Sequence, residues 1–353
     1  MATVDEATGP RPAGRGTRRP GGRRPRRGGP AALLAAALAT VLAAGCTSGG
    51  GPADDSRGST PPPGRTATAD PTPSTAPSPT AAAGQVLAVK IDNVRAARPQ
   101  TGLDAADVVY VEQVEGGLSR LMAVFATKLP KTVGPVRSAR ESDLELLRQF
   151  DRPVLAFSGA QGRLMPLIDR EPLEAVTPEN TDGVYFRGRD KASPHNLYLR
   201  PGRLLDEAPG AAALTTGFRH GPAPAGGNPA KERTVRFPSA RFTFTWSARA
   251  KGWELTTDGT PTRVTDGRRL APATVVVQYV KIRRSVYHDS LGNRTPYTET
   301  VGTGRAEVLR DGRSYPARWR RPAATDGTDF TAPDGRPLPF APGQVWVVLA
   351  AAR

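Results

Sequence analysis

From residue 85 onward, short apolar runs alternate with turn residues, a pattern typical of a strand-rich globular body. The first run, residues 86–91, predicts a buried strand. Asp92 and Asn93 follow it directly, so two polar side chains lie where a strand ends, a place where sites often form. We therefore take both as supporting residues of a candidate site.

Two further runs predict a β-hairpin. Residues 108–114 and 118–125 are mostly apolar and flank a Glu-Gly-Gly turn that begins at Glu115. Glu112 alternates with apolar residues along the first of these strands. If that face is buried, the Glu112 carboxylate needs a partner, because burying an unpaired charge is very unfavourable.

The segment GPVRSARE precedes a run with leucines at helical spacing, which predicts a helix over 143–150. Ser138 and Glu141 have the spacing of a capping box at its start. This arrangement puts Arg137 and Arg140 beside the positive end of the helix dipole, where acidic residues are normally favoured.

An anion among these two arginines would explain their position. An internal carboxylate, such as that of Glu112 or Glu115, is the interpretation we favour, because buried arginines are usually paired within the protein. The alternative is an external phosphate or carboxylate.

Strands are also expected over 152–157 and 183–187, and a helix is expected to begin at Pro201. Between the second of these strands and the helix, His195 and Asn196 lie in a loop. Three roles are open to His195: a hydrogen-bonded part of the scaffold, which we favour, a general base, or a metal ligand. The spacing of the three histidines supports no metal site.

Residues 209–234, rich in Ala, Gly and Pro, predict a linker. Beyond it, short strands alternate with Asp-Gly turns, and the pair within 309–315 is the strongest hairpin signal. Strands are expected over 241–246, 274–280, 304–309, 314–319 and 344–349. The predicted fold is α+β, with an N-terminal α/β domain containing a mixed sheet over 85–208 and a mostly β C-terminal domain over 235–353.

The N-terminal 45 residues predict a signal peptide. Residues 1–30 hold eight arginines and two acids, and the apolar run 31–44 is too short to span a bilayer. Cys46, the only cysteine, follows directly and completes a segment that resembles a bacterial lipobox, whose cysteine is lipidated. An ordinary secreted protein with an incidental cysteine and an uncleaved anchor are the alternatives, and both the Sec and the twin-arginine export routes stay open.

Residues 46–84 predict a lipidated cysteine followed by a disordered tether. Gly and Pro make up 14 of the 38 residues after Cys46, and the segment holds no Val, Leu, Ile or aromatic residue. Such a composition cannot bury enough apolar surface to offset chain entropy. The tether would reach between roughly 35 Å as a coil and about 120 Å when extended.

The charge of the chain changes once the signal peptide is removed. The formal charge of +16 falls to +10, because the signal peptide carries eight arginines and two acids. An exported protein meets no genome, so nucleic acid is not expected as a partner. Anionic lipid, wall polymers and acidic envelope proteins fit a basic surface equally well.

Six stretches occur in the order found in YerB-type bacterial lipoproteins, and the chain resembles that family over residues 86–348. The stretches are IDN at 91–93, ARPQTGL at 97–103, ADVVY at 106–110, EGGLSR at 115–120, GPVRSAR at 134–140 and SPHNLY at 193–198. In that family an Asn precedes the central C-terminal strand, and Ala273-Thr274 replaces it here. The family is a two-part domain of unknown function, so the resemblance implies a lipid-anchored envelope protein and no established reaction.

We therefore expect a non-catalytic binding or scaffolding module on the extracytoplasmic face of the cell membrane. Its ligand would be an anionic wall component or a membrane-protein partner, with no cofactor and no metal. The candidate ligand-binding residues are Arg98, Arg120, Arg137, Ser138 and Arg140, with Asp92, Asn93 and Asn196 in support.

The alternative is a hydrolase or transferase acting on cell-wall material. Glu112 or Glu115 would be the acid or base, His195 the second titratable group and Arg137 an anion stabiliser. No established catalytic motif supports this alternative. It requires Glu115, His195 and Arg137 to converge on one open cleft. A solute-binding subunit of a transporter ranks last, because the second half of the chain lacks alternating strands and helices.

Overall fold

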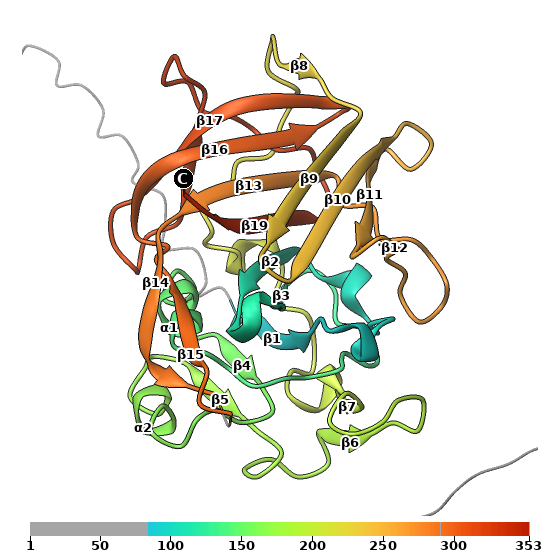
Figure 1. Ribbon diagram of the computed structural model, residues 1–353, viewed down its shortest axis with the longest axis vertical. Coiled ribbons are helices and arrows are strands. Elements are labelled where there is room, and N and C mark those ends of the chain that lie inside the picture. The colour runs from blue at the N-terminus through green and yellow to red at the C-terminus, as the bar shows by residue number, and fades with distance from the viewer. Residues whose placement is uncertain (1–83, 290, 353) are drawn as a thin grey trace, which may run out of the picture. The chain divides into compact units, whose positions relative to one another are not determined.

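The computed structural model describes residues 84–289 and 291–352, so the predicted signal peptide, Cys46 and tether lie outside the described residues. Strands predominate in this part of the chain. They form an eleven-stranded mixed sheet, a four-stranded sheet and two two-stranded ribbons (Figure 1). The order in the main sheet is β18-β17-β16-β13-β19-β2-β3-β1-β4-β5, and β8 also pairs with β17.

The first half of the described chain supplies one side of the main sheet and one ribbon. Its strands are β1 (Leu87–Asp92), β2 (Val108–Gln113), β3 (Ser119–Phe125), β4 (Val154–Ala156), β5 (Glu174–Val176), β6 (Tyr185–Arg187) and β7 (Leu197–Leu199). β2 and β3 pair antiparallel through a short turn, so the predicted hairpin is confirmed. The strands predicted near residues 86, 152 and 183 are also present.

The second half supplies the other side of the main sheet and the four-stranded sheet. Its strands are β8 (Asn228–Pro229), β9 (Glu232–Phe237), β10 (Ala240–Ser247), β11 (Gly252–Thr257), β12 (Thr260–Pro261), β13 (Thr274–Val280), β14 (Ile282–His288), β15 (Arg294–Thr298), β16 (Gly302–Arg310), β17 (Arg313–Arg321), β18 (Asp329–Thr331) and β19 (Val345–Ala351). The predicted Asp-Gly hairpin is confirmed between β16 and β17, where Asp311 and Gly312 both have positive φ, as a two-residue turn of this kind requires.

Both halves share the main sheet, because β19 pairs parallel with β2 from Val345 opposite Val108 to Val348 opposite Val111. The mixed sheet predicted for the N-terminal part is therefore continuous with strands of the C-terminal part. Residues 209–234, predicted to be a linker, contain β8 and pack along β17. The exact domain boundaries stay predictions.

The helices are shorter than the sequence pattern predicts, and one of them lies elsewhere. The α-helices are α1 (Glu141–Leu147) and α2 (Met165–Ile168), and the 3₁₀ turns are η1 (Arg95–Ala97), η2 (Leu103–Ala105), η3 (Glu115–Gly117), η4 (Pro201–Arg203) and η5 (Ala211–Ala213). The expected α/β character of the N-terminal part is not confirmed, and the fold is mostly β. Pro201 opens only a single 3₁₀ turn, because Gly202 and the nearby Pro209 and Gly210 do not sustain a helix.

The helix α1 begins at a different residue from the one the capping pattern predicts. Arg140 is its N-cap residue, and the Asp143 carboxylate accepts the Arg140 backbone N–H at 2.6 Å. Ser138 therefore does not cap the helix; its hydroxyl lies 3.4 Å from that of Ser158. The helix ends early because Arg152, with φ 42°, and Pro153 turn the chain away.

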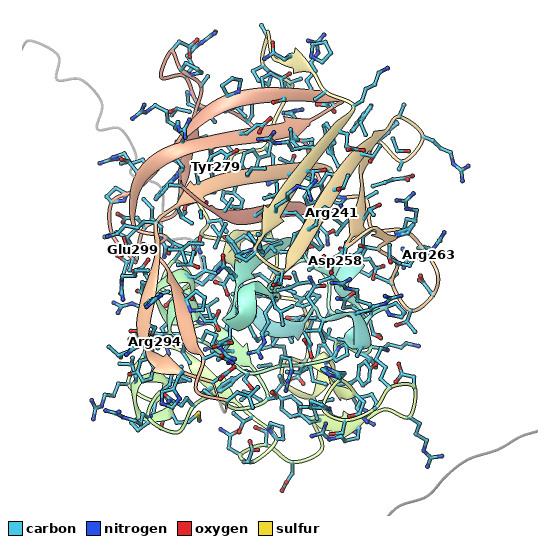
Figure 2. The ribbon with its side chains drawn as sticks, in the orientation of Figure 1. Arg241, Asp258, Arg263, Tyr279, Arg294 and Glu299 are labelled. Carbon is cyan, nitrogen blue, oxygen red and sulfur yellow. The ribbon has the colours of Figure 1, made fainter. Side chains whose placement is uncertain are left out.

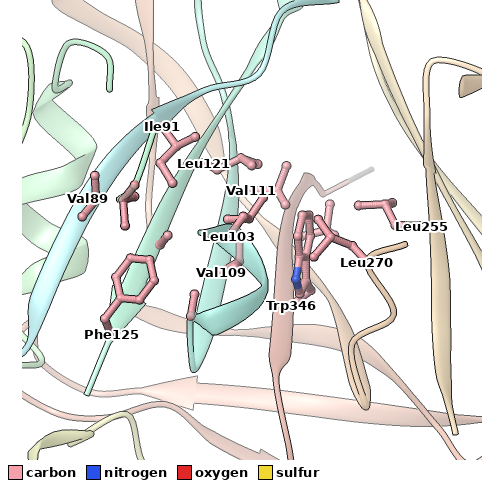
Figure 3. Packing of buried hydrophobic residues seen from close by; sticks show 14 of the residues in the cluster. Val89, Ile91, Leu103, Val109, Val111, Leu121, Phe125, Leu255, Leu270 and Trp346 are labelled. Atoms are coloured by element: carbon pink, nitrogen blue, oxygen red, sulfur yellow. The ribbon is translucent and has the colours of Figure 1, made fainter. Parts of the chain in front are cut away.

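The main sheet is buried on both faces near its centre, which accounts for the nearly continuous apolar sequence of β1, β2 and β19. On one face, Val109 and Val111 pack with Trp346 and with Leu255 of the four-stranded sheet (Figure 3). On the other face, Tyr110 packs in a cluster that includes α1. No helix within the described residues is long and apolar enough to cross a membrane.

Candidate functional site

A cleft of about 870 Å³ opens where the β2–β3 turn, the segment before α1 and the β14–β15 hairpin meet. The first half of the chain supplies Asp92, Glu115, Arg120, Arg137, Ser138, Arg140 and Glu141, and the hairpin supplies His288, Asp289, Asn293 and Thr295. The hairpin descends from the second half of the chain toward β5 (Figure 1). Both halves therefore build the walls of the cleft.

Glu115 and Arg140 form a bidentate ion pair at this cleft. Arg140 Nε donates to Glu115 Oε1 at 2.7 Å, and Nη2 donates to Oε2 at 2.8 Å. Burial would raise the pKa of Glu115, but the hydrogen bonds and charge of Arg140, with the Thr295 hydroxyl, lower it below its ordinary value. Glu115 is thus an ionised, fully engaged carboxylate, and Arg140 has the internal partner that the sequence favoured.

Asp92 gathers two side chains at the end of β1. Its Oδ2 lies 3.0 Å from Arg137 Nε and 2.8 Å from His195 Nδ1. The carboxylate is buried, whereas Arg137 and His195 are each about one quarter exposed. Arg137 lines the cleft, but His195 does not. His195 is therefore held against the back of the site by Asp92, as a scaffold residue would be.

Arg120 differs from the other two arginines of the cleft. Its Nη1 donates to the Ser138 carbonyl at 2.8 Å, and no carboxylate of the described residues lies within 4.0 Å of its guanidinium. Burial, followed by the charges of Arg140 and Arg137, lowers the pKa of Arg120 to about 10, although the charges of Glu115 and Asp92 oppose the shift. The group stays positively charged at neutral pH, in a place where two neighbouring cations repel it.

A buried ionic cluster lies behind the cleft. Lys90 Nζ donates to Glu112 and, at 2.5 Å, to Asp143, and all three side chains are at most 1% exposed. Burial, the largest effect, and the neighbouring Asp143 raise the pKa of Glu112 to about 8, although Lys90 opposes the shift. Glu112 is indeed buried with a partner, but that partner is Lys90 and neither of the arginines.

The β14–β15 hairpin is fixed to the first half of the chain by hydroxyl groups that donate to three glutamates. Ser285 donates to Glu141, and Thr295 donates to Glu115 at 2.5 Å. Glu145 accepts from the Tyr297 hydroxyl at 2.7 Å and from the backbone and hydroxyl of Thr300. Figure 2 labels Arg294 and Glu299 near the two ends of β15, which follows this boundary. Several hydrogen bonds thus hold the hairpin wall of the cleft against the first half of the chain.

The remaining predicted residues lie away from the cleft. Arg98 donates to the Asn93 carbonyl at 2.6 Å and pairs with Asp258 at 2.7 Å, so it links the first half of the chain to the four-stranded sheet. The Asn93 side chain donates to Ser119 at 3.0 Å beneath the β2–β3 turn. Asn196 donates to the Gly188 carbonyl at 3.0 Å within the β6–β7 ribbon.

Several residues that build this region could not be predicted from the sequence. Lys90 had one available signal, a single charge inside an otherwise apolar strand. The contact of Asp143 with Lys90 had no signal, because the two residues lie 53 positions apart, and neither had that of Thr295 with Glu115, because those two lie 180 positions apart. Within 84–289 and 291–352, no group of three or more His, Cys, Asp and Glu side chains could hold a metal ion.

Comparison with protein families identifies the chain. The N-terminal domain of a family described as "Protein of unknown function (DUF3048)" matches residues 72–214, and its C-terminal domain matches residues 233–347. The chain belongs to the DUF3048 family. The cleft of this DUF3048 chain is lined by residues within both matched regions.

A relative and a solved structure agree with this assignment. The chain is 26% identical over 279 residues to "Putative lipoprotein YerB" of Bacillus subtilis (strain 168), covering 74% of this chain and 80% of the relative. The crystal structure of the Bacillus subtilis YerB protein matches with a TM-score of 0.61 at 23% identity, covering 76% of this chain and 91% of that one. The resemblance to YerB-type proteins is confirmed, and the structural likeness shows a shared fold.

Proposed function

We propose that this DUF3048 chain is a lipid-anchored protein of the cell envelope that binds an anionic group in the cleft, without catalysing a reaction. The anchoring part of the proposal rests on the basic and apolar N-terminal segment, on Cys46 directly after it, and on the lipoprotein name of the Bacillus subtilis relative. Lipidated at Cys46, the body would lie on the extracytoplasmic face of the membrane.

The binding proposal rests on one observation, that Arg120 lacks a carboxylate partner among the described residues. Its guanidinium lies in the cleft with one hydrogen bond, to a carbonyl, and no carboxylate of the described residues within 4.0 Å. A guanidinium presents five N–H donors in a planar fork that matches phosphate and carboxylate oxygens. A bound anion would supply the missing acceptors and offset the repulsion from Arg137 and Arg140.

The neighbouring charged residues leave N–H donors of Arg120 and Arg137 available to a ligand. Arg137 reaches Asp92 through Nε, and its terminal amino groups make no hydrogen bond to any described residue. Two other acidic residues of the cleft wall have partners of their own, since Glu141 of α1 accepts from Ser285 and Asp289 of the hairpin accepts backbone N–H groups of its own turn. Arg120 and Arg137 thus offer two guanidinium groups to one anion.

The same contacts weigh against the enzyme alternative. Both oxygens of Glu115 are occupied by Arg140, and its lowered pKa makes it a poor proton donor. Glu112 is inaccessible behind the cleft, and His195 contacts Asp92 outside it. None of the three residues that the enzyme alternative names as acid or base is thus free to act on a substrate bound in the cleft.

The chemistry of the cleft favours a phosphate or carboxylate group carried by a wall polymer or by an envelope protein. Full-length protein in detergent can be titrated by calorimetry with inorganic phosphate and with a short poly(glycerol phosphate). Replacing Arg120 by Gln removes the free charge and most of its donors. Since charge-assisted hydrogen bonds contribute about 1.5–3 kcal/mol, R120Q is expected to weaken binding roughly 10- to 100-fold.

Arg148→Gln is the matched control, because Arg148 is a partly exposed arginine at the far end of α1 and does not line the cleft. Circular dichroism of each variant checks that the fold is retained. Protection of the wild type against heat by phosphate, lost in R120Q and kept in R148Q, supports the proposal. Equal binding by the wild type, R120Q and the double variant R120Q/R137Q would overturn it.

A further inference from the structure

Strand β9 is the edge of the four-stranded sheet, whose order is β12-β11-β10-β9 (Figure 1). Its register with β10 runs from Phe237 opposite Ala240 to Glu232 opposite Thr245, with no shift. One residue earlier, Trp246 N–H donates to the Lys231 carbonyl at 2.9 Å. In an antiparallel pair, alternate residues form the hydrogen-bonded pairs, so the odd-numbered residues of this strand face β10.

The even-numbered residues Glu232, Thr234 and Arg236 consequently direct their backbone N–H and C=O groups away from β10. None of these groups makes a hydrogen bond to a described residue. Natural edges are usually blunted by bulges, prolines, covering segments or very short strands. Strand β9 has six residues without a bulge or proline, and Pro238 stands only after its end.

The open edge borders a groove of about 680 Å³ above the main sheet. Tyr279 of β13, Arg305 of β16 and Ala350 of β19 belong to its lining, and Figure 2 labels Tyr279 on the main sheet. Arg233 crosses the groove, donating to the Tyr279 hydroxyl at 2.9 Å and pairing with Glu307 at 2.7 Å. A floor of this kind would support the side chains of an added strand.

The charge of the groove selects among possible occupants. No Asp or Glu lines it, whereas three arginines do: Arg233, Arg236 and Arg305. Arg236 and Arg305 are exposed, and neither lies within 4.0 Å of a carboxylate of the described residues. The Arg305 guanidinium instead lies 5.6 Å from the Tyr279 ring centre. An incoming chain with acidic side chains would find complementary charge.

We infer that β9 accepts an acidic segment of a partner protein as an additional strand. The backbone of the segment pairs with Glu232, Thr234 and Arg236, which supplies affinity, and its acidic side chains reach Arg236 and Arg305, which supplies selectivity. This surface is separate from the cleft, and no residue lines both. The inference therefore stands whether or not the cleft binds an anion.

Hydrogen exchange followed by NMR tests this inference on the full-length protein in detergent. The probe is a mixture of acetylated, amidated heptapeptides XEEXEEX, which carry acids on both faces of a strand and in which X is Val, Thr or Tyr, and the control is the same mixture with Lys in place of Glu. The acidic peptides are expected to slow exchange of the Thr234 and Arg236 amides at least 10-fold, and the Lys peptides are not. No slowing at millimolar peptide would overturn the inference.

Two variants separate backbone pairing from charge. Thr234→Pro removes an N–H that takes no part in the β9–β10 ladder, so the sheet tolerates it while strand addition is blocked. Loss of peptide binding by at least 10-fold is expected. The double variant R236E/R305E is expected to show a similar loss without altering the backbone, and so keeps the test valid if T234P does not fold. Arg249→Glu, in the exposed β10–β11 turn, is the charge control.

A polyanion would behave differently from a peptide strand. If poly(glycerol phosphate) binds the groove, R236E/R305E weakens it but T234P does not, because a polymer held by charge needs no backbone pairing. A folded T234P that binds the acidic peptides as tightly as the wild type would likewise show that β9 does not accept a strand. Either result overturns the inference.

Discussion

Arg140 holds Glu115 through two parallel hydrogen bonds, at 2.7 and 2.8 Å, and Thr295 donates to the same carboxylate at 2.5 Å. One carboxylate thus joins the β2–β3 turn, the N-cap of α1 and strand β15. The interaction brings together residues that are 25 and 180 positions apart. Such a junction makes the geometry of the cleft depend on a single buried charge.

Replacing Arg140 by Met should destabilise the protein strongly, because Glu115 would be left buried without its counter-ion. Removal of one partner of a buried pair costs roughly 3–5 kcal/mol. Urea unfolding followed by tryptophan fluorescence measures the loss. Arg148→Met removes a partly exposed pair with Glu171 at 3.3 Å and should cost less than about 1 kcal/mol. Equal losses in the two variants would contradict this role for Glu115.

Glu145 should contribute to stability in a pH-dependent way. Burial acts to raise its pKa, but hydrogen bonds from Thr300, Tyr297 and Val301 outweigh it and lower the pKa. The unfolded chain therefore binds a proton more readily, so this contribution is present above the ordinary pKa and lost as the pH falls through the folded value. Glu145→Gln should flatten the fall in unfolding free energy below about pH 5, whereas the control Glu171→Gln should not. A fall of unchanged steepness in E145Q would show that Glu145 is not responsible.

Glu112 should produce the opposite dependence at higher pH. Its pKa rises from 4.5 to about 8 on folding, so the folded protein binds the proton more tightly. That contribution is complete below pH 4.5 and is lost as the pH rises through about 8. Unfolding free energies measured at intervals from pH 5 to 8 should therefore decline in the wild type and stay flatter in Glu112→Gln, after correction for other groups with the control Glu299→Gln. Parallel profiles for the wild type and E112Q would contradict the assignment.

The sequence predicts what local chemistry determines. The Asp311-Gly312 turn and the hairpin around Glu115 follow from turn residues between apolar runs, and both are present. The predicted start of α1 is wrong. Ser138 has the capping pattern, but the Asp143 carboxylate accepts the Arg140 N–H, so Arg140 is the N-cap residue. A short side-chain pattern cannot distinguish neighbouring cap positions.

In the candidate site, too, local patterns predict some contacts and long-range contacts escape prediction. The place of Arg140 at the start of a helix predicts that it needs an anion. Glu115 is one of the two internal carboxylates that the sequence offers as its partner. The sequence does not predict the ion pair of Arg137 with Asp92. Nor does it predict that the hairpin carrying Thr295 forms a wall of the cleft. The position of the hairpin wall depends on how β19 joins the main sheet beside β2, a pairing between residues more than 200 positions apart. Such register is set by packing of the whole sheet rather than by any local pattern.

Arg321 should be among the most sensitive residues of the fold. It is fully buried at the end of β17, and its guanidinium donates to the Thr300 hydroxyl and to carbonyl groups at the end of α1, at 2.8–3.3 Å. Its other acceptors are the carbonyls of Ala324 and Asp326. Arg321→Met would leave these acceptors unsatisfied, each at a cost of about 1–3 kcal/mol, so a total loss of roughly 3 kcal/mol or more is expected.

The neighbouring Arg320 provides the matched control, because it lies in the same strand with its side chain exposed. Arg320→Met should change the unfolding free energy by no more than about 0.5 kcal/mol. Arg321→Lys should recover only part of the loss, since one ammonium cannot reach acceptors placed around a planar fork. Chemical unfolding of the three variants measures this ranking. If R321M were as stable as R320M, the carbonyl groups around Arg321 would have to find other donors, and its role in fixing α1 to β17 would be wrong.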